Sequence, residues 1–239
     1  MPGFSTRRGT GFPDDPVNYR DAYRSEAGAK TQCEMTRPGS EANPERPGGM
    51  GDLQMDVKGV AFLARQTLAV QSFGEAAWKG FLAEQAKRDP LFGQPIMPVT
   101  RIPADTFLRL NEAFTQRFYA GDTKAYWQYG IKSAEYALGQ GQLKTMFGKD
   151  DFRRFALFTP GIWKGYFTEG ELTAQLHQNV VELRITGVPR PHIYFEYAVM
   201  GFAAGGLAYL GGGKEIHHEV LKGFSKADAE VLYRFNLPG

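Results

Sequence analysis

The order of apolar patterns along this 239-residue chain predicts an α+β fold, in which an N-terminal helical layer precedes a hairpin, a helix and a second hairpin. Apolar residues recur at helical spacing up to about Phe167, and the period changes to two after Gly170. Prolines and glycines separate the segments. We therefore expect the hairpins to form a small antiparallel sheet covered by helices, behind an extended N-terminal arm.

The arm comprises residues 1–51, which are rich in proline and glycine. It contains seven basic and seven acidic residues, so its net charge is zero. Few apolar side chains remain to offset an ordering cost of roughly 1–2 kcal/mol per residue. We expect most of this segment to be mobile on its own, and residues 52–239 to form a single α+β domain.

A short helix over 16–28 is the best-specified part of the arm. Asp15 suits the cap position and Pro16 the first turn. Tyr19 and Tyr23 would then share one face of this helix. One interpretation makes these tyrosines a partner-binding face, and the other makes the segment a transient turn in a linker.

Five helices are expected next. The first runs from about Leu53 to Gly74, and its stripe consists of Val57, Val60, Ala64 and Leu68. The second carries Trp78 and stops before Pro90, because proline disfavours helical geometry in the residue before it. Residues 90–104 form an extended connector. The remaining three are a helix capped by Asp105 and closed by Gly121, one from Asp122 towards Phe147, and one over 152–167 that is bent or broken at Pro160.

The second half of the domain predicts strands. Leu172, Ala174 and Leu176 alternate with polar residues, and Val181, Leu183 and Ile185 do so beyond a turn at Gln178-Asn179. A glycine-rich apolar helix follows over 193–210. A second hairpin spans 214–237 and turns around 223–228.

Composition excludes several classes of function. A net charge of +2 argues against nucleic-acid binding through bulk charge. Cys33 is the single cysteine, so neither an intramolecular disulfide nor a thiolate metal cage can form. No secretory signal is visible, and we expect a cytoplasmic protein. The uncharged stretch from Tyr197 to Gly213 barely reaches a membrane-spanning length, so it predicts a buried core helix rather than a transmembrane span. Peripheral membrane contact is left open.

No candidate catalytic motif in the sequence is complete. The glycine run before Lys214 fails as a phosphate loop, because Ala208 stands where a glycine is required and Glu215 follows the lysine. Gly201 and Gly205 instead favour close approach of a helix to another backbone. The segment 215–219, with His217 and His218, favours a solvated strand face over a metal site. The sequence therefore predicts no enzyme, no metal and no cofactor.

Aromatic residues crowd the helical segments between 112 and 167. Most must serve core packing, but they exceed what one apolar stripe per helix requires. The surplus indicates either a cavity for a hydrophobic ligand or a protein contact face. The candidate lining residues are Phe114, Phe118, Tyr129, Phe155, Trp163 and Phe167.

Two short motifs carry a family resemblance. Lys58-Gly59 followed by Gly74-Glu75-Ala76-Ala77-Trp78 resembles the opening of haem-nitric-oxide-binding domains. The later glycine-rich helix and closing hairpin are similar to those domains, to vinyl-reductase-type domains and to small subunits of the TRAPP transport particle. Together with Gly121-Asp122, these motifs most resemble an uncharacterised paralogous family of myxobacteria. The resemblance covers roughly 56–237.

The resemblance implies a domain that senses or scaffolds, but the haem-binding residues of the family are missing. Those domains use a helical histidine as the iron ligand, and 152–167 contains none. The region assigned to their Tyr-x-Ser-x-Arg motif reads Tyr197-Ala198-Val199-Met200-Gly201, without serine or arginine. In some relatives an apolar pocket holds a fatty chain or a tetrapyrrole.

The combined prediction is a haem-free, non-catalytic binding or assembly subunit. Its partner, another protein or a second copy, would associate through residues 1–51. The alternative is a binding protein for an apolar small molecule, such as a lipid or tetrapyrrole pigment. A vinyl-reductase-related enzyme that modifies tetrapyrroles is the third hypothesis, and it would need a buried titratable pair that the sequence does not show.

Overall fold

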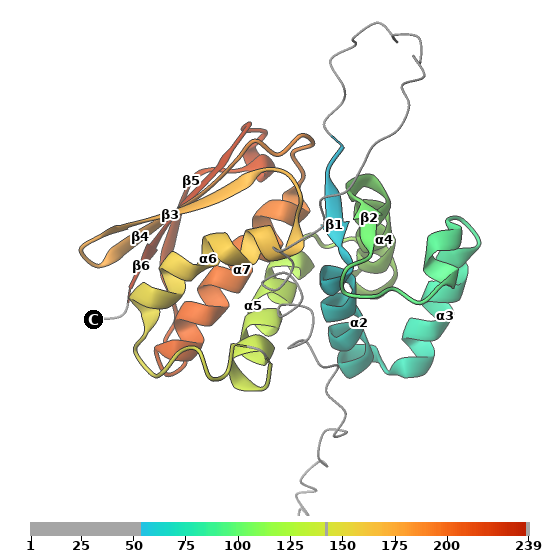
Figure 1. Ribbon diagram of the computed structural model, residues 1–239, viewed down its shortest axis with the longest axis horizontal. Helices are drawn as coiled ribbons and strands as arrows, with labels where there is room; N and C mark the ends of the chain where they lie inside the picture. The colour runs from blue at the N-terminus through green and yellow to red at the C-terminus, as the bar shows by residue number, and fades with distance from the viewer. Residues whose placement is uncertain (1–53, 142, 238–239) are drawn as a thin grey trace, which may run out of the picture. The chain divides into compact units, whose positions relative to one another are not determined.

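The computed structural model describes residues 54–141 and 143–237, so the arm, its helix over 16–28 and Tyr19 and Tyr23 lie outside the described residues. Figure 1 shows the described elements, which confirm the predicted α+β fold. In chain order they are β1 (Asp56–Lys58), α2 (Gly59–Phe73), α3 (Glu75–Ala86), η1 (Pro90–Gly93), β2 (Arg101–Pro103), α4 (Ala104–Tyr119), α5 (Lys124–Gly139), α6 (Phe152–Tyr166), β3 (Glu171–His177), β4 (Val180–Thr186), α7 (Ile193–Leu210), β5 (His218–Lys222), η2 (Phe224–Lys226) and β6 (Val231–Asn236).

The two predicted hairpins join into one antiparallel sheet with the strand order β3-β4-β6-β5. The central pair, β4 and β6, sets Leu183 opposite Tyr233 and Ile185 opposite Val231. These side chains are buried, whereas Arg184, between Leu183 and Ile185, and Arg234, next to Tyr233, are exposed. The alternation in the sequence therefore marks one buried and one solvated face, and α6 and α7 lie against the buried face (Figure 1).

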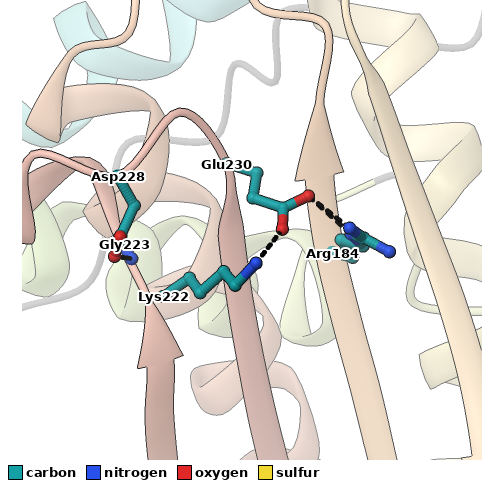
Figure 2. A network of polar contacts seen from close by, with 5 residues as sticks. All are labelled: Arg184, Lys222, Gly223, Asp228 and Glu230. Carbon is teal, nitrogen blue, oxygen red and sulfur yellow. Dashed lines mark hydrogen bonds and ion pairs between the residues drawn. The ribbon is translucent and has the colours of Figure 1, made fainter.

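A polar network on the sheet ties three strands together. Figure 2 shows the Glu230 carboxylate between Lys222 of β5 and Arg184 of β4, with oxygen–nitrogen distances of 2.5 Å to each. These two cations lower the pKa of Glu230, the bond from Lys222 contributing most. In the adjoining turn, the Gly223 amide donates to the Asp228 carboxylate.

The start of the domain corrects the sequence prediction. Val57, expected in a helix, lies in β1 and pairs with Ile102 of β2, in the segment expected to be a connector. The helix α2 begins only at Gly59, where a side chain would collide with the Met97 carbonyl oxygen at 2.0 Å. Pairing between segments far apart in sequence thus overrides a local helical pattern.

Helix ends also differ from prediction. Pro103, rather than Asp105, precedes α4, and Asp105 lies in its first turn. Helix α5 begins at Lys124 and ends at Gly139, well before Phe147. Glycine has low helix propensity, and Gly139 and Gly141 together account for the early end.

Helix α6 continues through Pro160 as one element. Proline has no N–H to donate to the carbonyl four residues back, which is that of Ala156. The Thr159 hydroxyl donates to this carbonyl instead, at 2.7 Å. A side chain therefore replaces the backbone donor that the proline removes.

Helices α5 and α7 pack closely, as Gly201 and Gly205 predicted. A side chain at Gly201 would lie 2.4 Å from the Trp127 carbonyl oxygen, and one at Gly205 would lie 2.7 Å from the Ile131 Cα. Gly130 of α5 faces α7 in the same way. Helix α7 alone among the described helices is long and apolar enough to span a membrane, and most of it is buried within this domain.

Candidate functional site

A small cavity lies among α2, α5, α6, α7 and the start of β3. Its volume is about 70 Å³. Its walls are largely apolar and include Ala61, Ile162, Leu172, Val199 and Phe202. Residues with small side chains also line it, among them Ala64 of α2 and Ala198 of α7.

A second cavity of about 170 Å³ lies beside α4. Phe73, Phe114 and Tyr119 line it, together with polar side chains that include Gln128 and Lys132. Arg65 and Tyr129 line both cavities, so this pair of side chains stands between them.

The six predicted pocket residues do not all line the same cavity. Tyr129, Trp163 and Phe167 line the first cavity, and Phe114 lines the second with Tyr129. Phe118 stacks against Phe114, with ring centroids 4.6 Å apart, and Phe155 packs on Phe202. Neither Phe118 nor Phe155 is among the residues that line these two cavities.

Arg65 is the residue of this site that sequence reasoning missed. Its side chain is almost fully buried, with 5% of the residue exposed. The guanidinium carbon lies 3.4 Å from the centroid of the Tyr129 ring. The Nε donates to Asn111 Oδ1 at 3.0 Å, and the Asn111 amide donates in turn to the Phe107 carbonyl, which fixes the orientation of that amide.

Part of the guanidinium has no partner. Arg65 Nη1 is buried without a hydrogen bond, and so is the Tyr129 hydroxyl. Over residues 54–141 and 143–237, no carboxylate forms an ion pair with Arg65. A sequence signal for this residue did exist, since Arg65 is the lone charged side chain of α2.

The phenols at the cavity are held in the neutral form. Burial raises the pKa of Tyr129 and Tyr194 well above the ordinary value, against an opposing effect of the Arg65 charge. The histidines lie elsewhere: none of the four lines either cavity. His218 stacks on Trp127, and His192 precedes α7. In the described part of the chain, no cluster of three or more acidic, histidine or cysteine residues could hold a metal.

Helix α7 holds a second buried charge that the sequence reading passed over. The Glu196 carboxylate, fully buried, accepts from the Ser225 amide at 2.7 Å, the Ser225 hydroxyl at 2.8 Å and the Tyr233 hydroxyl at 2.7 Å. It fastens α7 to the turn between β5 and β6. This charge is satisfied within the domain, in contrast with Arg65.

Comparison with known proteins gives a fold. No protein-family model matches the chain, and no curated protein matches it in sequence. Among solved structures, an H-NOX protein from S. oneidensis in the Fe(II)NO ligation state is 16% identical with a TM-score of 0.57, over 76% of this chain and 99% of that one. The NMR structure of an H-NOX domain from Shewanella oneidensis in the Fe(II)CO state is 15% identical with a TM-score of 0.59, over 76% and 99%. The chain thus has the fold of haem-nitric-oxide-binding domains.

The residues of this cavity do not fit a haem. Proteins hold haem iron through histidine, cysteine, methionine or tyrosine. The cavity lining contains none of the first three, and burial keeps two of its three tyrosines, Tyr129 and Tyr194, protonated. A volume of about 70 Å³ is also well below that of sites for larger ligands. Helix α6, expected at the ligand position, carries Trp163 and Tyr166 towards the cavity but no histidine.

Proposed function

We propose that this chain is a non-catalytic, haem-free binding domain that holds a small apolar molecule in the cavity among α2, α5, α6 and α7. The observation that carries the proposal is an apolar cavity inside a body with a sensor-type fold, without a facing acid–base pair. This is the small-molecule alternative of the sequence prediction. The cavity volume favours a compact ligand over a tetrapyrrole, and therefore disfavours the vinyl-reductase-related enzyme.

Native mass spectrometry of the purified full-length chain tests the proposal, together with thermal unfolding in the presence of small apolar compounds. We expect a bound mass, or an increase in Tm that grows with ligand concentration. Substitution Ala198→Leu should fill the cavity and abolish both effects. Ala76→Leu, on the exposed face of α3, is the matched control and should leave them unchanged. Absence of any bound compound and of any Tm shift in the wild type would overturn the proposal.

We also propose association with a protein partner or a second copy through residues 1–51. Support comes from the neutral, proline-rich and glycine-rich composition, with Tyr19 and Tyr23 spaced to share a helical face. Such a segment loses conformational entropy on binding and can cover a large surface. A binding domain with this arm would couple ligand occupancy to assembly.

A further inference from the structure

The unmatched charge of Arg65 sets this cavity apart from an ordinary packing defect. Removing a guanidinium from water is costly unless anions or acceptors replace the lost hydration. Here Nε has Asn111 as its acceptor, while Nη1 has no acceptor at all. Stacking on Tyr129 engages the face of the guanidinium and provides no acceptor for the N–H groups of Nη1, which lie in its plane.

The same fold satisfies its other lone buried charge completely. The Glu196 carboxylate accepts three hydrogen bonds, which Ser225 and Tyr233 donate. Glu196 lines neither of the two cavities. Arg65, in contrast, lines two cavities whose walls contain no acidic residue. The residue that carries the unpartnered donor therefore also lines the empty volume.

We propose that Arg65 binds the carboxylate of a small apolar acid. The inference rests on the proposed function, which supplies the site for the hydrocarbon part among Ile162, Val199 and Phe202. A planar guanidinium matches a carboxylate in shape and charge, and this geometry favours that group over a neutral polar one. The unpartnered hydroxyl of Tyr129, a residue that lines both cavities, is the second donor that we assign to the ligand. The volume of the cavity limits the ligand to a short-chain acid, because a cavity of about 150 Å³ is needed to hold benzene.

Pairs of compounds, each an acid and its amide, test whether Arg65 recognises a carboxylate in the full-length chain. Isothermal titration calorimetry compares propionate with propionamide and butyrate with butyramide, and the two members of each pair differ little in size. We expect the wild type to bind each acid at least about tenfold more tightly than its amide, since hydrogen bonds to charged groups are the stronger ones. Arg65→Met should abolish this preference while leaving amide binding within about threefold.

Two further variants serve as controls for this interpretation. Lys132→Met removes the exposed cation at the second cavity and should leave the acid preference intact. Tyr129→Phe keeps the stacking ring but removes the hydroxyl, and should weaken acid binding several-fold even if Arg65→Met does not fold. Equal binding of acid and amide by the wild type would overturn the inference, as would a preference that survives both Arg65→Met and Tyr129→Phe. Failure of every probe to bind would instead count against the proposed function itself.

Discussion

Among the described residues, four buried side-chain atoms have no hydrogen-bond partner: Arg65 Nη1, Trp78 Nε1, Thr115 Oγ1 and the Tyr129 hydroxyl oxygen. The Glu196 carboxylate and the Ala156 carbonyl each find side-chain donors. Arg65 differs from these two groups, because its Nη1 has no hydrogen-bond acceptor. A buried donor without a partner costs about 1–3 kcal/mol, so retaining one beside a cavity is consistent with a ligand that completes it.

Thr159 provides a test at the residue scale. Thr159→Val should destabilise the domain by about 1–3 kcal/mol, because the Ala156 carbonyl would lose its donor beside Pro160. Urea denaturation measures this change. Thr159→Ser keeps the hydroxyl and is the conservative control. Adding Pro160→Ala to Thr159→Val restores a backbone N–H for that carbonyl, so the double variant should recover part of the loss; no recovery would contradict this account.

At the scale of elements, contacts at helix ends and helix crossings position the cavity walls. Helix α7 is held at its start by His192 and Glu196, and along its length by the close approach of α5. Helices α5 and α7 each contribute to the cavity, so their spacing sets its width.

The crossing of α5 and α7 should tolerate no added methyl group. Gly201→Ala would place a Cβ 2.4 Å from the Trp127 carbonyl oxygen, and we expect a loss of about 1–3 kcal/mol. Gly80→Ala is the matched control, because nothing lies within 4 Å of a Cβ there and α3 is exposed at this position. Alanine has the higher helix propensity, so that variant should gain about 0.5–1 kcal/mol. Chemical denaturation compares both, and equal effects would refute the packing explanation.

The start of α7 should be sensitive to acid. His192 Nδ1 accepts from the Tyr194 amide at 3.0 Å, which requires the neutral ring, while Nε2 lies 3.2 Å from Glu112. Burial lowers the pKa of His192; the Glu112 carboxylate opposes this shift, and Arg190 adds to it.

Because the folded pKa lies below the ordinary value, the unfolded state binds the proton more readily. The stabilisation by His192 is therefore present above an ordinary pKa of about 6.5 and is lost as pH falls through the folded value. Unfolding free energies measured between pH 7 and pH 5 should decline more steeply for the wild type than for His192→Asn, which caps without titrating. Parallel pH profiles for the two proteins would argue against this role.

At the scale of the whole molecule, the described residues hold their own core and the arm precedes it in the chain. The core runs from Met55 to Leu237, so the sheet, the helices and both cavities are all built within residues 54–237. The ligand proposal and the association proposal therefore concern different parts of the chain.

Removing residues 1–51 separates the two proposals. We expect the remaining chain to keep its Tm within a few degrees, since the described residues form an apolar core of their own. Association, measured by light scattering or by capture of a partner, should weaken. A truncated protein that assembles as well as the full chain would rule out a role for the arm, and one that fails to fold would show that the arm belongs to the domain.

Much of the fold could be predicted because its signals are local. The hairpin over 171–186 and the helix over 193–210 follow from periodicity and turn residues within a few positions of each other. The candidate site was harder to predict from the sequence. Surplus aromatic content pointed to Tyr129, Trp163 and Phe167. It did not point to Arg65, the single charged residue of its helix.

The sequence by itself determined the order and type of most elements, the glycines at the crossing of α5 and α7, and the absence of histidine from α6. Only the tertiary structure decided that β1 pairs with β2, that β4 joins β6, and that Arg65 stacks on Tyr129 beside a cavity. Local patterns depend on neighbouring residues alone. Strand partners, cavities and unmatched charges depend on which distant segments meet, and that is a property of the packed chain.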